Sequence, residues 1–573
     1  MIPCLPQKDW LPGVRKARLT ADRFIYQYDR DYHDLPFPLE WPLLGLFPPR
    51  YYARLAALTL AVDANQWASD ALTWLNSGRV LDDFVAWMRK PERLELEYTY
   101  GEREPPPRFS AGARTPESLR TYDRLLPLLP KPAAAALWCE PEFFAWQRVA
   151  GAYPIALRST DSGEAWAPAL TSAIDRALAP TSDCTEAARK EQRLFIVEYP
   201  LAKGLPAGFG DGWRRYLPEV SGYFVRPPRQ PRIQPVAIRC GDDGVFTPRD
   251  GAVWDAARAV LQAVESTVHG VAEHGVACHI VLTLIALATY RCLGHNHPLR
   301  VLLTPHFEFT IPVTLVTKSF FSPGGRTINL QSVSLQGCIE LARRRWGQFD
   351  WTRDTVPGSI QTRGLLAPEI LPEYPFRDDV LLLEQVIRSW VLAYVGLYYD
   401  DDEPLDQDHE LQNWLRELSA AHCAGIAGIP KIEKVDDLVR LVTQIIHRAT
   451  AYHAAINDPV YDAMGYVPNM PGACYDAPPL ASASAAPDPL TLLPPRDKAQ
   501  AQIADVYVVS NTKLNRLGHY PACTFVDPRV WPLQRAFLDA LGEAERTIEE
   551  RNRTRFLPYR VLLPSRLTAS INV

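Results

Sequence analysis

The sequence predicts a mainly α-helical fold with one small β element. Six long stretches carry apolar residues at helical spacing, whereas only two short stretches are rich in β-branched residues. The chain has 52 prolines among 573 residues, and they cluster between the helical stretches and seldom within them. Because proline interrupts helices, this distribution marks the loops between them.

The expected helices recur along the whole chain. They span residues 58–75, 252–292, 378–400, 408–424, 434–457 and 533–551. The strand candidates are RLFIVEY at 193–199 and PVAIRC at 235–240, which place the β element near residues 190–240. A stretch dense in Pro, Ala and Ser at 474–496 predicts an unstructured surface excursion. We expect one large domain over residues 1–573, because apolar runs continue beyond this excursion.

Composition excludes several classes of protein. The net charge is -5, the isoelectric point is near 6.2 and no Lys/Arg run occurs, so a nucleic-acid partner is not expected. The ten cysteines form no CxxC pair, which favours buried thiols in a reducing compartment. The first residues contain no apolar signal region, and the longest apolar run, Ile280–Ala288, is too short to span a membrane. We therefore expect a cytoplasmic protein with a buried core helix.

Two of the helical stretches carry an unusual set of polar residues. His269, His274 and His279 follow one another at five-residue steps, and His453 precedes Asn457 by four residues. Both stretches are otherwise rich in Ala, Val, Ile and Leu, so these side chains are expected to face a buried interior. The carboxylate that ends the chain could supply a further oxygen. Nitrogen and oxygen ligands without thiolate suit a mononuclear iron better than a structural zinc.

The five-residue spacing constrains the geometry of such a site. On a regular α-helix, positions five apart diverge by roughly 140° and could not bind one ion. A π-bulge returns residues i and i+5 to one face, so we expect one between His274 and His279. His453 and Asn457 need no distortion. The alternative is that each histidine bonds a carbonyl in the core; from the residues alone, a non-haem iron site and another nitrogen and oxygen metal site both remain open.

The motifs resemble those of one family along the whole chain. The run His269–Leu293, LLTPHFEFT at 302–310, YHAAIN at 452–457 and YVPNMPG at 466–472 resemble the iron-ligand region of lipoxygenases. FAWQRVAGAYP at 144–154 and the tail LPYRVLLPSRLTASINV are similar to other blocks of that family. The resemblance is to bacterial stand-alone lipoxygenases, which lack the N-terminal β-barrel domain of the eukaryotic enzymes. It implies a single helical catalytic domain without that barrel.

The resemblance also implies a cofactor and a reaction. The implied ligands of one non-haem iron per chain are His274, His279, His453, Asn457 and the terminal carboxylate of Val573, with His269 outside the ligand set. The only catalytic group implied is an iron-bound hydroxide, which takes a hydrogen atom from the bis-allylic carbon of a polyunsaturated fatty acid or related lipid. Dioxygen then adds to give a conjugated hydroperoxide. We expect a monomer with no membrane-docking domain.

Several positions depart from the family pattern. Gly270 stands where the family commonly has Gln or Glu, and Val460 stands where it has Gln. Those side chains form a bridge that orients the asparagine ligand, and the loss of such groups can weaken metal binding. Thr317 stands where Ala or Gly correlates with product chirality. Phe321 replaces a Leu that clamps the pentadiene, and Met470 matches an Arg that binds the substrate carboxylate in plant enzymes.

These departures favour an altered substrate or stereochemistry and leave alternatives to an ordinary lipoxygenase open. One is a lipid hydroperoxide isomerase, or an oxygenase of a specialised unsaturated metabolite, on the same iron site. Another is a lipid-binding protein with this fold and no turnover. Each alternative predicts a different use of oxygen and of lipid hydroperoxide.

Overall fold

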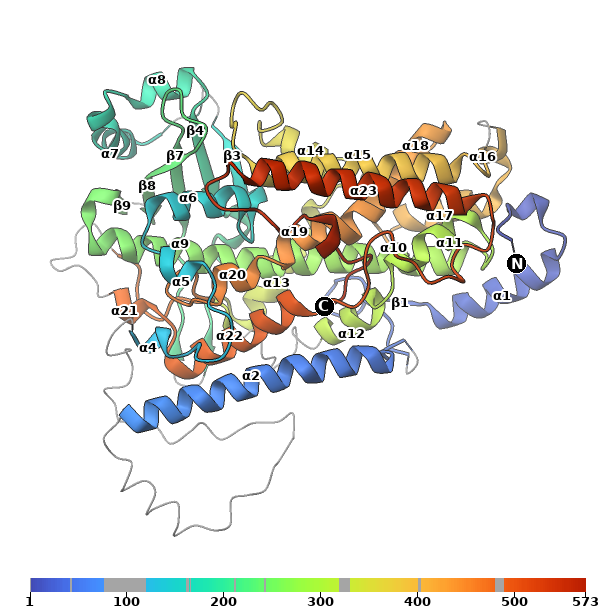
Figure 1. Ribbon diagram of the computed structural model, residues 1–573, viewed down its shortest axis with the longest axis horizontal. Helices are drawn as coiled ribbons and strands as arrows, with labels where there is room; N and C mark the ends of the chain where they lie inside the picture. The colour runs from blue at the N-terminus through green and yellow to red at the C-terminus, as the bar shows by residue number, and fades with distance from the viewer. Residues whose placement is uncertain are drawn as a thin grey trace, which may run out of the picture.

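The protein is mainly helical, with a small sheet at one end, as predicted (Figure 1). The computed structural model describes residues 2–41, 44–76, 120–160, 164, 166–210, 213–241, 244–318, 330–399, 403–479 and 489–573. One cluster of buried apolar side chains runs from Leu5 to Ile571, so both ends of the described chain join the same core. Figure 1 shows the C-terminus near the middle of the molecule and the N-terminus at one end.

A continuous central helix forms the axis of this core. It consists of α9 (Ala252–Val268), the π-helix η6 (His269–Ile280) and α10 (Val281–Cys292). Among the described residues it is the one helix apolar and long enough, at 41 residues, to cross a membrane. Its most apolar window is 89% buried by the rest of the protein, which identifies it as a core helix, as the sequence predicts.

A second helical rod packs beside the first. It is built from α18 (Val435–His447), the π-helix η10 (Arg448–Tyr452) and α19 (His453–Asn457). α18 packs on α15 (Pro375–Val395), which packs in turn on α23 (Val530–Asn552). Figure 1 shows α15, α18 and α23 side by side along one edge of the molecule.

The sheet lies at the end of the molecule where the central helix begins. It has five antiparallel strands in the order β3 (Leu157–Ser159), β4 (Leu194–Glu198), β7 (Val220–Val225), β8 (Gln234–Cys240) and β9 (Gly244–Phe246). The two predicted strands are β4 and β8. α7 (Pro168–Leu178) packs on β8 and β9, α6 (Pro141–Ala150) packs on β8, and α9 packs on β7 and β8. A Cβ at Gly222 would lie 2.7 Å from Leu261 Cδ1, so this glycine lets α9 approach the sheet closely.

The remaining elements surround the two rods. They are η1 (Pro6–Lys8), α1 (Pro12–Ile25), β1 (Tyr28–Asp29), β2 (Phe37–Pro38), α2 (Pro49–Asn76), α4 (Arg120–Asp123), α5 (Ala134–Leu137), η2 (Pro154–Ala156), η3 (Ala179–Thr181), α8 (Thr185–Lys190), η4 (Pro200–Ala202), β5 (Phe209–Gly210), β6 (Trp213–Arg214), η5 (Pro248–Asp250), α11 (Pro298–Leu303), η7 (Thr304–His306), α12 (Thr310–Lys318), α13 (Leu335–Gln348), α14 (Val356–Thr362), α16 (Glu403–Gln407), α17 (His409–Ser419), α20 (Val460–Met464), α21 (Pro489–Leu492), α22 (Arg496–Asn511) and η11 (Pro564–Arg566).

All six predicted helices are present, with shifted ends. α2 begins at Pro49, nine residues before the predicted start, because proline is well accommodated in the first turn of a helix. α17 ends at Ser419, because Ala420 is extended and a turn with Gly425 at φ +65° follows. Nine of the 23 residues of the predicted surface excursion, 480–488, lie outside the described residues. Its second end is not unstructured, because α21 (Pro489–Leu492) is helical and Leu492 and Leu493 are buried. Its first residue, Cys474, is buried and pairs with Tyr216, so that end of the segment belongs to the core.

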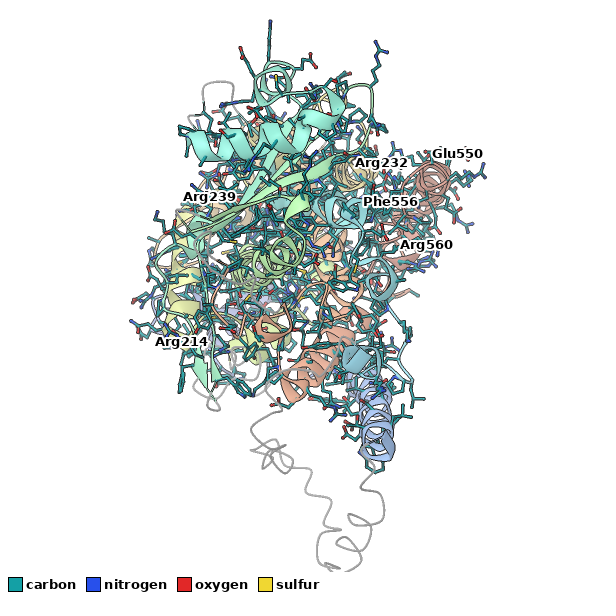
Figure 2. All side chains as sticks on the ribbon, turned by 90° about the vertical axis from the view of Figure 1, so that its left-hand side faces the viewer. Arg214, Arg232, Arg239, Glu550, Phe556 and Arg560 are labelled. Carbon is teal, nitrogen blue, oxygen red and sulfur yellow. The ribbon has the colours of Figure 1, made fainter. Side chains whose placement is uncertain are left out.

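The sheet is tied to the C-terminal part of the chain. Figure 2 shows Arg232, in the turn before β8, on the same side as Phe556, which follows α23; the guanidinium lies 5.8 Å from the centre of the ring. Arg232 Nε also pairs with Glu373 at 2.9 Å. The contact between Arg232 and Phe556 thus joins segments more than 300 residues apart.

Candidate metal centre

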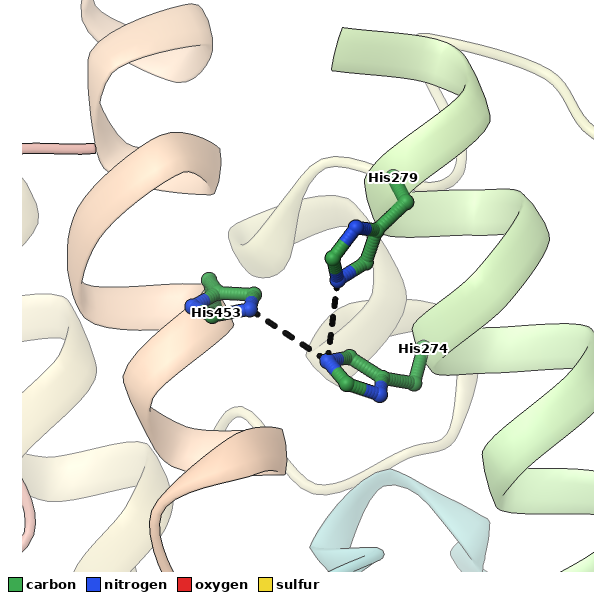
Figure 3. A group of neighbouring side chains, drawn as sticks. All are labelled: His274, His279 and His453. Carbon is green, nitrogen blue, oxygen red and sulfur yellow. Dashed lines mark hydrogen bonds between the residues drawn. The ribbon is translucent and has the colours of Figure 1, made fainter. Parts of the chain in front are cut away.

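Three histidines from the two rods converge inside the protein (Figure 3). His274 Nε2 lies 3.1 Å from His279 Nε2 and 3.3 Å from His453 Nε2. All three ligand atoms lie within 4.8 Å of one another. The structure thus brings His274 and its neighbour His279 together with His453, which is 179 positions from His274 in the sequence.

The π-helix η6 explains how His274 and His279 share one face. It covers His269–Ile280, so the expected distortion is present and extends over twelve residues. Its i→i+5 bonding places residues five apart one above the other. A second π-helix, η10, ends directly before His453 and was not predicted. Apolar residues at helical spacing are compatible with both helix types, so no sequence signal distinguishes this second turn.

His269 stands outside the cluster. Its Nε2–H donates to the carbonyl of Ile456 at 2.8 Å, and its ring is parallel to that of His274 at a centroid distance of 6.0 Å. For this residue the core alternative was correct, because a carbonyl partner satisfies it. The bond joins the two rods beside the cluster.

Asn457 presents an unpaired oxygen in the interior. Its Nδ2 donates to Asp458 Oδ1 at 3.2 Å and to the carbonyl of Val509 at 3.1 Å. Its Oδ1 is buried and accepts no hydrogen bond from the part of the chain described. A buried acceptor without a partner is costly, which is expected where a metal ion completes the bonding.

The donor set fits one metal ion. His279 and His453 are each 3% exposed, while His274 is partly accessible. Burial, reinforced by neighbouring charged forms, holds the pKa of all three well below the usual histidine range. They are therefore neutral near pH 7, as metal binding requires. Two nitrogens about 2.1 Å from one ion and at a right angle lie about 3.0 Å apart, close to the two separations observed.

A buried polar network supports the two ligand rods and was not predicted from the sequence. The Tyr452 hydroxyl donates to Glu273, whose other oxygen lies 3.5 Å from Arg345 Nε. Arg345 also pairs with Asp354 at 2.5 Å. The signal available was Glu273 itself, a carboxylate inside an otherwise apolar helix, which requires a buried partner.

The end of the chain is held inside the protein. Ser570, Ile571 and Asn572 are buried, and Val573 is partly exposed. His306 Nδ1–H donates to the Ala569 carbonyl at 2.7 Å. These contacts bring the tail into the core; that the Val573 carboxylate reaches the cluster stays a prediction.

Of the three residues expected to contact the substrate, the structure describes two. Thr317 is half-buried in α12, where its hydroxyl donates to the Val313 carbonyl at 3.0 Å. α12 is joined to α10 by the Thr283–Thr314 hydrogen bond of 2.7 Å. Met470 is buried, and Phe321 lies outside the described residues.

The two positions near the ligands that depart from the family pattern, Gly270 and Val460, also differ in their surroundings. Val460 is buried. At Gly270 an added Cβ would lie 2.9 Å from Gln331 Nε2, so the Gln331 side chain occupies the space that a side chain at position 270 would take. Neither Gly270 nor Val460 has a polar side chain, so the bridge that the family builds from these two positions cannot form here.

Comparisons of the sequence identify the family of proteins that share these features. The sequence pattern of the lipoxygenase family matches residues 228–561. A linoleate 9/13-lipoxygenase of Pseudomonas aeruginosa is 32% identical over 486 residues, covering 80% of this chain and 70% of that protein. A hydroperoxide isomerase of Homo sapiens is 29% identical over 450 residues, covering 76% of this chain and 62% of that protein.

Solved structures share the fold over the full chain. A lipoxygenase crystallised anaerobically with arachidonate superposes with a TM-score of 0.85 at 21% identity, covering 100% of this chain and 84% of that one. A calcium-dependent 11R-lipoxygenase gives a TM-score of 0.83 at 22% identity, covering 100% and 83%. At this identity the likeness establishes the fold.

Proposed function

The chain belongs to the lipoxygenase family of dioxygenases, and from this premise we propose that it is a non-haem iron lipoxygenase acting on a polyunsaturated fatty acid. The product would be a conjugated lipid hydroperoxide. The observation that carries the proposal is the convergence of three neutral imidazoles on a point bordered by largely apolar helices. Apolar surroundings suit an alkyl chain.

The proposed iron would be held by His274, His279, His453 and Asn457. Bound iron supplies the one-electron chemistry needed to remove a hydrogen atom from a bis-allylic carbon. The protein residues keep three Nε2 lone pairs free, since burial suppresses protonation of the rings. The bond from His269 to Ile456 and that from Tyr452 to Glu273 fix one rod against the other, so the ligands are positioned before metal binds.

We extend the proposal to residues whose roles come from the family resemblance. The Val573 carboxylate would be the fifth ligand, which the burial of the preceding three residues supports. Thr317, Phe321 and Met470 would contact the substrate. For Thr317 the proposal is supported by its position on α12, which is hydrogen-bonded to α10, the helix that continues from η6.

The proposal includes the organisation and location of the protein. One catalytic domain over residues 1–573 is supported by the large apolar cluster that runs from Leu5 to Ile571. A cytoplasmic location is supported by the ten cysteines, all within the described residues and all unpaired. We propose a monomer that uses dioxygen as its second substrate.

A second candidate reaction uses the same site. The similarity to a human hydroperoxide isomerase, with the changes at Gly270 and Val460, favours isomerisation of a supplied lipid hydroperoxide. In that case dioxygen would not be consumed with the parent acid. The two candidate reactions therefore differ in whether dioxygen is consumed with the parent fatty acid.

Oxygen uptake separates these candidates. Iron-loaded protein is mixed in air with linoleic or arachidonic acid, and dissolved oxygen and conjugated-diene absorbance are followed together. A lipoxygenase consumes oxygen as the absorbance rises. Turnover of added lipid hydroperoxide without oxygen uptake on either acid would establish the isomerase, and iron-loaded protein inert toward both would refute both reactions.

A further inference from the structure

An ion pair lies directly behind the asparagine of the metal centre. Asp458 Oδ2 accepts a hydrogen bond from Lys513 Nζ at 2.5 Å, and Asp458 Oδ1 accepts from Asn457 Nδ2 at 3.2 Å. The Asp458 and Lys513 side chains are only 13% and 32% exposed. The two carboxylate oxygens thus have separate partners, one in the centre and one outside it.

This arrangement determines which way the Asn457 amide faces. The Asp458 carboxylate and the Val509 carbonyl can only accept hydrogen bonds, so the NH2 group must point to them. A flip of the amide would place its oxygen against two acceptors. The Asn457 oxygen is therefore left facing the interior, where it has no partner among the described residues.

Lys513 also begins the segment that holds the chain end. Its Nζ donates to the Arg566 carbonyl at 3.2 Å, and the next residue, Leu514, donates its N–H to Asn572 Oδ1 at 2.7 Å. Asn515 Oδ1 accepts from the Asn572 amide at 3.1 Å. The ion pair consequently lies between Asn457 and the tail.

We propose that Asp458 and Lys513 are positioning residues that hold the Asn457 oxygen, and with it the chain end, toward the metal. The inference rests on the proposed iron site. It gives this chain a substitute for the bridge that is missing at Gly270 and Val460. The orienting group comes from the residue next to the ligand and from α22, whose Val509 supplies the second acceptor.

Two variants remove the pair from opposite sides. Asp458→Ala removes the carboxylate acceptor. Lys513→Met removes the ammonium charge and keeps an aliphatic side chain of similar length. Each is expected to release iron to a chelator about 10- to 100-fold faster than the parent protein. The double variant should resemble the single ones, because residues that act as one unit are not additive. Electron paramagnetic resonance of the ferric protein should change in all three.

The controls use the same chemical changes away from the ligands. Asp539→Ala, at an exposed position of α23, and Lys431→Met, on the surface, should keep the parental iron release and spectrum. If Asp458→Ala fails to fold, Asp458→Asn takes its place, since its amide puts an NH2 donor against the donor of either Asn457 or Lys513. Parental iron release and spectrum in Asp458→Asn and Lys513→Met would overturn the inference and leave the iron site standing. A parent protein that binds no iron would instead refute the proposed function.

Discussion

The hydroxyl of Tyr452 donates a hydrogen bond to the carboxylate of Glu273, and each of these residues directly precedes a histidine of the cluster. Both are buried, and the contact joins the two helical rods. The bond therefore couples the position of His274 to that of His453.

Replacing Tyr452 by Phe tests this coupling. The change leaves Glu273 with Arg345 alone, and a buried hydrogen bond to a charged group contributes about 1.5–3 kcal/mol. We expect a loss of that size in the free energy of unfolding by urea. Tyr52→Phe, at a half-exposed tyrosine, is the matched control and should change it by less than about 0.5 kcal/mol. Equal effects of the two changes would contradict a role for the bond.

Acid should destabilise the fold through buried neutral histidines. Burial lowers the pKa of His306 and His447 from 6.5 to about 4. Between these pH values the unfolded chain binds a proton that the folded chain does not, so stability is lost as pH falls from 6.5 to 4 and is retained above. Each ring contributes about 3 kcal/mol to this change.

The contribution of one ring can be isolated. His447→Gln keeps an N–H for the Val380 carbonyl, which His447 Nε2 contacts at 3.0 Å, but cannot titrate. Urea unfolding at pH 7 and pH 4.5 should therefore show a smaller acid loss in the variant than in the parent. An unchanged difference would show that His447 is not buried as a neutral ring.

Extending the chain beyond Val573 tests the fifth ligand. Two added alanines would move the terminal carboxylate by up to about 7 Å. We expect weaker iron retention and loss of oxygen uptake, whereas the same addition before Met1 should change neither. Full activity with bound iron in the C-terminal variant would remove Val573 from the ligand set.

Thr317 is predicted to influence the stereochemistry of oxygenation. Thr317→Ala removes a hydroxyl and a methyl group from α12, so we expect a changed ratio of hydroperoxide isomers with unchanged iron content. The neighbouring Val316 is 51% exposed, and Val316→Ala serves as the control. Chiral chromatography of the products provides the readout, and identical ratios in all three proteins would count against the assignment.

Much of the helical frame follows from the sequence, because long periodic segments leave little choice of structure. The β-branched segments RLFIVEY and PVAIRC identify β4 and β8. β7 was missed because Ser221 and Gly222 interrupt its apolar pattern and all six of its residues are buried, which removes the alternation that marks a half-exposed strand.

The metal cluster, like the fold, could be predicted only in part from the sequence. His274 and His279 are marked by a spacing that makes chemical sense only on a π-helix, and that helix is present. The residues that hold the ligands in place have no such signal in the sequence. Asp458 and Lys513 are 55 residues apart, and nothing in their local sequence indicates that they meet at Asn457. Such contacts depend on tertiary packing, which periodicity does not encode.

The iron content of three purified proteins tests the central claim most directly. His279→Ala removes a member of the cluster, while His269→Gln alters a histidine of the same π-helix that bonds a carbonyl instead. We predict about one iron per chain in the parent and in His269→Gln, and almost none in His279→Ala. A parent protein without iron after expression with iron supplied, or full iron content in His279→Ala, would contradict the account.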